Sequence, residues 1–321
     1  MKKGPKRYIL GKYLKMRFPD LPTKLAFVLI GRTGTCNGSC IHCPTGKART
    51  AGSPRQPMDM RLFKKLIDGI DNLPMKPPTH IGFGLFGDGL VDPYVVERMR
   101  YSRDRIPHGH FVINTNGAAF SAARHAELNG LVNLVTLHCE SLVAETYDYL
   151  MQPLRAKNVF PKYRALIETF HGKVHVSVPI SRLNIDQAAE IREQFLNWGA
   201  STVHFDPLAS RCEPDPVLFR ELSLDPFPIR CGPDVLDNLI IDCDGQVLVC
   251  CQDFAREESI GSLQDQSLLK LLTNHRRRLV RRRFSEGAHE EMATCSRCFG
   301  DLRTENFPFD VSLSPHMPAD S

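Results

Sequence analysis

The chain has 321 residues, of which 42% are hydrophobic and 24% charged, and a formal net charge of +5 at pH 7. This composition is typical of a globular protein with a sizeable core, and the charge is too small for this length to indicate nucleic-acid binding. The apolar runs are too short to cross a bilayer, and the basic N-terminal stretch lacks the continuous apolar core of a signal peptide. We therefore expect a cytoplasmic protein that binds neither nucleic acids nor membranes.

Strand-like and helix-like segments alternate along the first two thirds of the chain. Such alternation predicts an α/β fold with a parallel sheet, arranged as a partial barrel or a doubly wound layer. The expected strands cover residues 25–31, 80–86, 110–114, 131–138, 173–179 and 202–206. The expected amphipathic helices cover residues 60–73, 93–105, 121–129, 161–171 and 186–198.

The pattern changes after residue 208. Residues 213–233 contain five prolines and no clear periodicity, which indicates a linker. The dipeptide Asp244-Gly245 lies between two apolar arms and predicts a β-hairpin, and a helix is expected around residues 264–283. We therefore divide the chain into an N-terminal extension (1–24), an α/β domain (25–212), and a linker with a small C-terminal domain (213–321).

Eleven cysteines in a chain expected in the cytoplasm indicate metal binding or thiol chemistry rather than disulfides. Cys36, Cys40 and Cys43 follow the first expected strand at spacings of 4 and 3 residues. Three thiolates suit a 4Fe–4S cluster that keeps one iron open for a substrate or cofactor. A structural zinc site completed by His42 or a distant cysteine is the alternative.

This CxxxCxxC loop, placed directly after the first strand, resembles the signature of radical S-adenosylmethionine (SAM) enzymes. The resemblance implies a partial (β/α)6 barrel in which the cluster binds SAM. It extends to three further places in the sequence. The segment of Phe86, Gly87 and Asp88 resembles the element that holds the SAM amino group in this family. Asn114 and Asn116 resemble a turn of the same family. Ser177 and Arg182 stand where family members often bind the ribose and the methionine carboxylate. Asp88 and Gly89 depart from the Glu-Pro pair of that family's pattern.

A second set of cysteines lies in the C-terminal part. Cys231, Cys250, Cys295 and Cys298 are separated by 19, 45 and 3 residues, and four thiolates fit either a second cluster or zinc. The arrangement resembles the short "twitch" form of the SPASM extension of radical SAM enzymes, which carries one auxiliary 4Fe–4S cluster. The resemblance thus implies two 4Fe–4S clusters, SAM, and an external one-electron reductant of the flavodoxin or ferredoxin type.

The remaining cysteines fall outside both sets. We expect Cys139, Cys212 and Cys243 to be small buried hydrophobic residues. Cys251 directly follows Cys250, and adjacent residues at a strand end point in opposite directions, so its thiol is expected to face the barrel mouth. The layout resembles that of radical SAM epimerases of aminoglycoside biosynthesis, of the type that converts neomycin C to neomycin B, in which a cysteine returns a hydrogen atom to the substrate.

We therefore expect a radical SAM epimerase, an isomerase that inverts a sugar carbon of an aminoglycoside with Cys251 as donor. A dehydrogenase of an aminocyclitol, which passes an electron to the auxiliary cluster, and a peptide-maturing enzyme are the alternatives. A zinc-stabilised RNA-binding protein is the alternative from another class. Because a polycationic substrate needs carboxylates, Glu140, Asp206 and Asp253 are expected substrate contacts, together with His138 at the end of the fourth strand.

Overall fold

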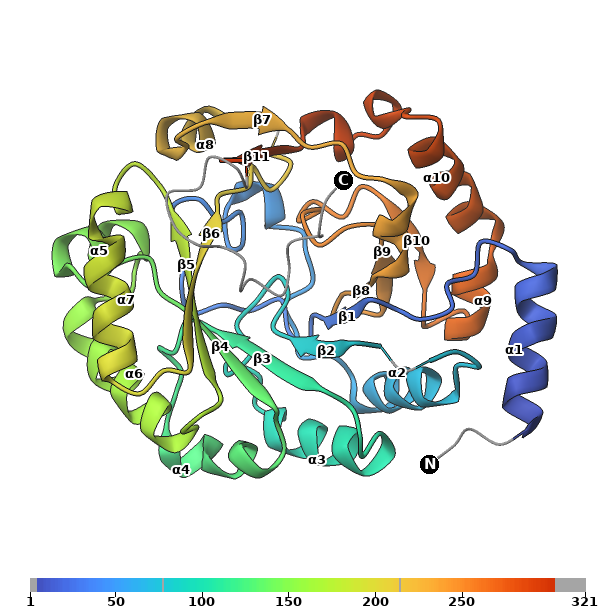
Figure 1. Cartoon of the computed structure of the whole chain (residues 1–321), viewed down its shortest axis with the longest axis horizontal. Coiled ribbons are helices and arrows are strands. Elements are labelled where there is room, and N and C mark those ends of the chain that lie inside the picture. Colours follow the sequence, from blue (N-terminus) through green and yellow to red (C-terminus); the bar gives the residue numbers. More distant parts are fainter. Residues whose placement is uncertain (1–4, 77, 214, 304–321) are drawn as a thin grey trace.

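The computed structural model describes residues 5–76, 78–213 and 215–303. Its centre is a curved nine-stranded sheet in the order β10-β9-β8-β1-β2-β3-β4-β5-β6, and every neighbouring pair from β1 to β6 is parallel (Figure 1). These six strands are β1 (Phe27–Ile30), β2 (His80–Phe83), β3 (Phe111–Thr115), β4 (Leu134–His138), β5 (Val174–Ile180) and β6 (Thr202–Pro207). The α/β fold with a partial (β/α)6 barrel is thereby confirmed.

Helices connect these strands and lie along the outer side of the curved sheet (Figure 1). They are α2 (Met60–Asn72), α3 (Val95–Arg105), α4 (Ala122–His125), α5 (Ala144–Leu150), α6 (Ala156–Thr169) and α7 (Ala188–Asn197), with short 3-10 turns at η1 (Ala48–Thr50), η2 (Ala126–Gly130) and η3 (Ile185–Gln187). The sequence did not predict α5, and α6 begins five residues before its expected start at Pro161.

The two faces of the sheet carry different apolar clusters. Val28 and Ile30 of β1 are fully buried in the main core, which also contains residues of α2. Phe27 and Leu29 belong instead to a smaller cluster built on Leu85, Ile240 and Leu248. Because successive side chains of a strand point to opposite faces, this second cluster marks the face turned away from the helices. We call it the inner-face cluster.

The predicted hairpin is confirmed and continues the same sheet. It consists of β8 (Leu239–Ile241) and β9 (Gln246–Leu248), followed by β10 (Ser259–Ser262), all antiparallel to their sequence neighbours. Gly245 at the turn has a φ of +85°, a conformation that favours glycine. β8 pairs in parallel with β1, from Val28 opposite Leu239 to Ile30 opposite Ile241. The strand that leads into the first cysteine loop therefore lies directly beside the C-terminal hairpin.

The segment expected to be a linker is partly regular. It contains α8 (Val217–Leu222) and β7 (Pro226–Pro228), and β7 pairs antiparallel with β11 (Phe299–Asp301) in a separate two-stranded sheet. The single helix expected around residues 264–283 is divided at Asn274. The remaining elements are η4 (Pro233–Asp237), α9 (Leu268–Thr273), α10 (His275–Ser285), η5 (His289–Glu291) and η6 (Cys295–Arg297).

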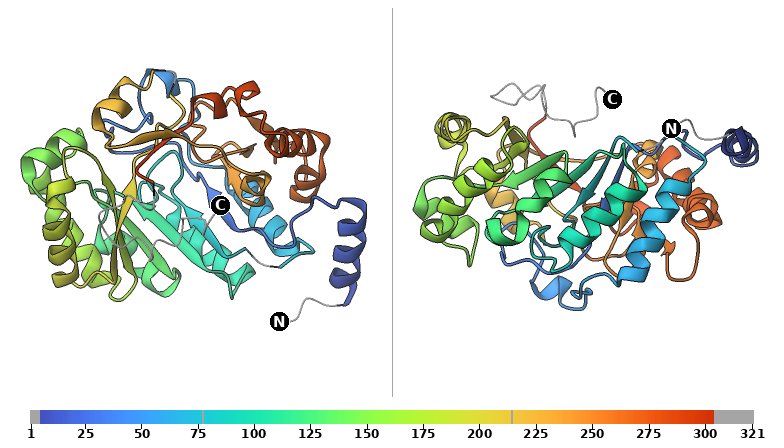
Figure 2. Two further views of the ribbon diagram at one scale, coloured as in Figure 1. Left: turned by 45° about the horizontal axis from the view of Figure 1, so that its top comes forward. Right: turned by 90° about the horizontal axis from the view of Figure 1, so that it is seen from below.

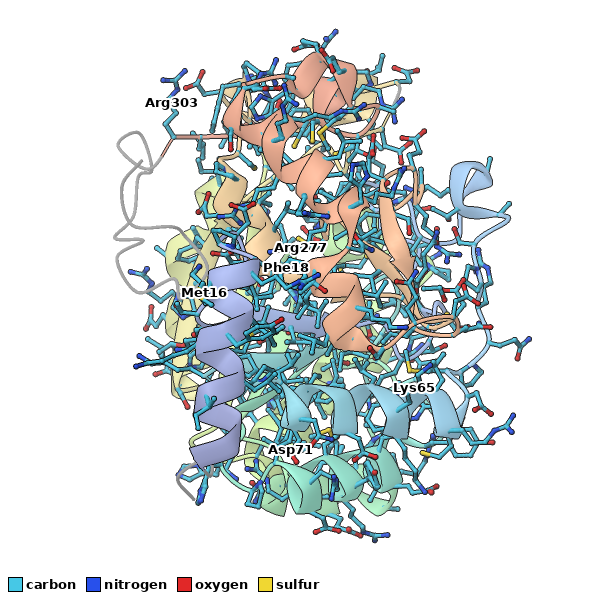
Figure 3. The ribbon with its side chains drawn as sticks, turned by 90° about the vertical axis from the view of Figure 1, so that its right-hand side faces the viewer. Met16, Phe18, Lys65, Asp71, Arg277 and Arg303 are labelled. Atoms are coloured by element: carbon cyan, nitrogen blue, oxygen red, sulfur yellow. The ribbon has the colours of Figure 1, made fainter. Side chains whose placement is uncertain are left out.

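Helix α1 (Pro5–Arg17) lies at the rim of the molecule next to the C-terminal helices (Figures 2 and 3). Figure 3 looks onto this side, where Arg277 of α10 is buried and donates to the carbonyls of Leu236 at 2.9 Å and Asp20 at 3.4 Å. Arg277 is therefore a buried structural residue, although arginines lie mostly at the solvent-exposed surface of proteins. Within the described part of the chain, no helix has the length and apolar character that a membrane span needs.

Candidate functional site

The first cysteine loop leaves the carboxyl end of β1, with Cys36, Cys40 and Cys43 all half-buried. The Cys36 sulfur accepts hydrogen bonds from the backbone N–H of Gly38 at 3.3 Å and from Nδ2 of Asn116 at 3.5 Å. Lys47 Nζ donates to the Cys40 carbonyl at 2.9 Å and to the Ile41 carbonyl. N–H donors and an ammonium group beside three thiols suit an anionic cluster held by thiolates.

Burial, followed by the negative charge of Asp88, raises the pKa of the Cys36 thiol to about 12. Burial also raises the pKa of Cys40. The Cys36 and Cys40 thiols therefore keep their protons until iron displaces them, as expected for ligands whose metal binding releases protons. The donor set thus fits a three-thiolate iron–sulfur cluster, and Cys36, Cys40 and Cys43 stay its predicted ligands.

The loop after β2 packs tightly against the segment that precedes the first cysteine. A Cβ added to Gly87 would lie 2.4 Å from the carbonyl oxygen of Thr33 and 2.5 Å from that of Thr35, so only glycine fits there. Phe86 has a φ of 60°, and its carbonyl accepts a hydrogen bond from Thr45. The predicted SAM-binding element is therefore adjacent to the cluster loop.

Asp88 is buried, and its carboxylate forms hydrogen bonds with two loops. It accepts hydrogen bonds from the backbone N–H of Leu90 at 2.9 Å, from the Thr115 hydroxyl at 2.9 and 3.0 Å, and from the backbone N–H of Asn116 at 2.7 Å. These contacts join the ends of β2 and β3. They are a role that the sequence did not predict, and the contact of Asp88 with an ammonium group stays a prediction.

The turn after β3 is tied to the cluster loop by Asn116. Besides its contact with Cys36, the Asn116 amide donates to Oδ1 of Asn37 at 2.9 Å, and its oxygen accepts from the N–H of Ala118 at 2.9 Å. The carbonyl of Asn114 accepts from the N–H of Gly89 at 2.9 Å. Both predicted asparagines are thus brought to the cluster loop and the β2 loop.

The ends of β4, β5 and β6 bring together three of the predicted side chains. Ser177 donates to the carboxylate of Asp206, and Ser177 pairs in register with His138 on β4. Arg182 is exposed, and its guanidinium donates to the carbonyl of Leu224 at 3.3 Å. The structure therefore places Ser177, Asp206 and His138 together and leaves Arg182 outside this group.

Glu140 is buried directly after β4, with Oε1 3.4 Å from Nε2 of His42 in the cluster loop. Burial raises the pKa of Glu140 to about 8, against an opposing influence of Arg211. Burial also lowers the pKa of His42 to about 3, and the charge of Arg211 acts in the same direction. The pair therefore holds a neutral carboxyl group beside a neutral imidazole at pH 7.

Arg211 is a site residue that the sequence did not single out. It follows β6, donates to Oε1 of Gln252 at 3.3 Å, and lies with its guanidinium carbon 5.4 Å from the centre of the Phe254 ring. Its charge acts on Glu140 and His42, so it lies among the predicted substrate contacts. The sequence could have indicated Arg211 by its position after the sixth strand, because functional side chains of barrel folds lie at the carboxyl ends of the strands.

The prediction for Asp253 needs a correction. Its side chain is 1% exposed, and its carboxylate accepts from the backbone N–H groups of Glu257 at 3.0 Å and Glu258 at 2.8 Å. Because both oxygens stabilise the turn that leads into β10, Asp253 is a structural residue of its own loop.

The second cysteine set surrounds one cavity with an empty volume of about 320 Å³. Its wall includes all four predicted ligands and one further thiol: Cys231, Cys250, Cys295, Cys298 and Cys212. Four thiols that line one cavity supply the ligand set of a fully ligated 4Fe–4S cluster, so this donor set fits the predicted auxiliary cluster.

Cys139, Cys212 and Cys243 are buried as expected, but Cys212 is not an isolated hydrophobic residue. A hydrogen bond from Cys212 lowers the pKa of Cys298 and raises that of Cys212. The expectation for Cys212 is therefore corrected by its position in the cavity wall.

The two adjacent cysteines Cys250 and Cys251 occupy different surroundings. β9 ends at Leu248, so the strand-alternation argument used for this pair does not apply, and their thiols share a hydrogen bond. Nevertheless, Cys250 lines the cavity, whereas Cys251 packs against the inner-face cluster, as Phe86 also does. This hydrogen bond and the charge of Arg211 lower the pKa of Cys251 to about 7.

The fold and these sites resemble known proteins. The family model of SPASM, an iron-sulfur cluster-binding domain, matches residues 231–299. No sequence among the curated proteins matches the chain. The structure of BtrN in complex with AdoMet and 2-DOIA has a TM-score of 0.58 at 17% identity, covering 85% of this chain and 92% of BtrN.

Two further solved structures show the same fold. anSMEcpe with bound AdoMet has a TM-score of 0.59 at 14% identity, covering 79% of this chain and 82% of its own. SuiB of Streptococcus suis, bound to the precursor peptide SuiA, has a TM-score of 0.62 at 11% identity, covering 84% of this chain and 68% of SuiB. The predicted likeness to radical SAM enzymes with a SPASM-type domain is thereby confirmed in the fold and in the C-terminal iron–sulfur domain.

Proposed function

We propose that the chain is a radical SAM epimerase that inverts a carbon of an aminoglycoside or aminocyclitol, with Cys251 as the hydrogen donor. The observation that carries this proposal is the placement of the adjacent cysteines. Cys250 lines the thiol cavity, whereas Cys251 is not in the cavity wall and packs against the inner-face cluster. Phe86, in the loop whose Gly87 meets the segment before Cys36, packs against the same cluster. One thiol is thus left outside the auxiliary ligand set, on the face of the sheet that the predicted SAM-binding element also contacts.

Cys36, Cys40 and Cys43 would hold the first cluster, which together with SAM would supply the 5′-deoxyadenosyl radical chemistry that takes a hydrogen atom from the substrate carbon. Cys251 donates its thiol hydrogen atom to the opposite face, so that the S–H bond breaks and a C–H bond forms. The sulfur radical left on Cys251 takes one electron from the flavodoxin- or ferredoxin-type reductant and one proton from solvent. The substrate neither gains nor loses electrons overall.

The polar side chains at the strand ends support a cationic sugar as substrate. Glu140 and Asp206 supply two carboxyl groups, and Ser177 and His138 lie beside them. An ammonium group of the substrate would favour the ionised form of Glu140, whose pKa burial raises to about 8. Binding is therefore expected to release a proton from Glu140.

A dehydrogenase is the second candidate, and one contact favours it. Cys251 shares a hydrogen bond with Cys250 of the cavity wall, which gives a substrate radical a short path to an auxiliary cluster. The BtrN structure holds 2-DOIA beside AdoMet, which is compatible with a small-molecule substrate here. A peptide substrate is the third candidate, because the SuiB structure holds a precursor peptide.

Turnover of candidate aminoglycosides in deuterated water separates these reactions. Epimerisation with a thiol donor places one solvent deuterium at the inverted carbon, whereas a ketone without deuterium would refute it. Cys251→Ala is expected to abolish inversion while 5′-deoxyadenosine still forms. Cys243→Ala, which removes a buried thiol outside the cavity wall, is the matched control and should invert normally. Inversion at the normal rate by Cys251→Ala would show that the donor is another group.

A further inference from the structure

Residues 208–212, which follow β6, form hydrogen bonds with the segment that carries Cys295 and Cys298 and continues into β11. Ser210 donates its backbone N–H to the carbonyl of Phe299 at 2.9 Å and accepts the N–H of Phe299 on its hydroxyl at 3.0 Å. The same hydroxyl donates to the carbonyl of Arg297 at 3.0 Å. Ala209 and Gly300 form an antiparallel bridge between the two segments. Cys212 is therefore held beside Cys298 by backbone pairing rather than by a chance side-chain contact.

The turn at Arg211 and Cys212 directs their two side chains to different sites. Their φ angles are 53° and 55°, and two successive non-glycine residues in this left-handed region are uncommon and strained. The Arg297 guanidinium holds this turn by donating to the Cys212 carbonyl at 3.2 Å. As a result, Arg211 reaches Gln252 on one side while the Cys212 thiol lines the cavity on the other.

The cavity therefore presents one thiol more than a fully ligated 4Fe–4S cluster uses. We propose that Cys212 is a fifth ligand-competent thiol of this site, which can bind the cluster in place of Cys298. When its sulfur binds iron, Cys212 gives its proton to solvent. The proposal rests on the proposed function in one respect, namely that the cavity holds an iron–sulfur cluster.

The test uses a background in which the first cluster cannot form, the combined Cys36→Ala, Cys40→Ala and Cys43→Ala variant. Iron and acid-labile sulfide bound after anaerobic reconstitution then report on the second site alone. We expect about four irons per chain in this background and about four after Cys298→Ala is added. Adding Cys212→Ala as well leaves three thiolates, as in the first cluster loop, so one iron is left open and iron should pass to a chelator at least about tenfold faster than in the Cys298→Ala variant.

The matched control adds Cys243→Ala instead of Cys212→Ala. Cys243 is equally buried but donates to the carbonyl of Pro54 at 3.3 Å, outside the cavity wall. This control should keep about four irons and release them at the rate of the Cys298→Ala variant. If Cys298→Ala does not fold, as judged by circular dichroism, Cys298→Ser carries the same series with a side chain of nearly the same size.

Loss of iron in the folded Cys298 variant, with Cys212 still present, would overturn the ligand role of Cys212. Equal rates of iron release in the presence and absence of Cys212 would overturn it as well. A background variant that binds no iron would overturn the iron–sulfur part of the proposed function and this proposal together. The first two results concern Cys212 alone, so the two failures are distinguishable.

Discussion

Asn116→Ala tests whether the turn after β3 holds the first cluster loop. The substitution removes the contacts with Cys36 at 3.5 Å and Asn37 at 2.9 Å, and leaves the N–H of Ala118 without its acceptor. At about 1 kcal/mol for each hydrogen bond, we expect a loss of about 2–3 kcal/mol in the free energy of unfolding of the cluster-free protein. Mutation of a residue that hydrogen-bonds a metal ligand typically lowers metal affinity 10- to 100-fold. We therefore expect iron to leave the reconstituted protein faster by about that factor.

Urea unfolding measures the first effect, and the rate of iron transfer to a chelator measures the second. Asn133→Ala is the control. Asn133 likewise makes side-chain hydrogen bonds, accepting from the N–H of Phe111 at 2.9 Å and from Arg103 at 2.8 Å, but at the opposite end of β3. It should destabilise the protein by about 1–2 kcal/mol without changing iron release. If both variants release iron equally fast, or Asn116→Ala releases it at the normal rate, the assigned role of Asn116 is refuted.

Two further predictions concern stability. Gly87→Ala drives a methyl group to 2.4 Å from the backbone of Thr33 and should cost about 1–3 kcal/mol in urea unfolding, whereas Gly130→Ala, which meets no atom within 4 Å, should cost less than about 1 kcal/mol. Equal effects of the two changes would argue against the tight packing. Burial lowers the pKa of His125 to about 4, so the unfolded chain binds a proton that the native protein does not bind between about pH 6.5 and 4. The native protein should therefore lose up to about 2 kcal/mol between pH 7 and 5, and His125→Asn should lose less; the same loss in both would contradict this.

The six parallel strands could be predicted because each is a short apolar run, as expected of a strand buried on both faces, and most are bounded by residues that favour turns. The hairpin at Asp244-Gly245 was found because a left-handed glycine is required there. The start of α6 was missed because Pro161 favours a first helical position, whereas here it lies in the sixth position of the helix. α1 was missed because its basic residues interrupt its apolar ones.

The cysteine sets could be read from spacing alone, but their surroundings could not. The position of Cys212 depends on a left-handed turn and on backbone pairing with residues nearly ninety positions later, as in the bond between Ser210 and Phe299. Sequence periodicity carries no information on such a contact. Asp253 was predicted as a substrate contact because it lies close to Cys251 in the sequence. In the structure both of its carboxylate oxygens accept backbone N–H groups of its own turn, which the sequence did not indicate.

The sequence pattern changes near residue 212, but the sheet continues across this boundary, because β8 of the C-terminal part pairs in parallel with β1. A fragment that ended there would expose the edge of β1, with unpaired backbone groups of the kind that recruit other chains and cause aggregation. The C-terminal part would lose the strand that orders its hairpin. The two iron–sulfur regions are thus parts of one cooperative folding unit, and an evolutionary exchange of the C-terminal domain must preserve the edge of β1 on which it is built.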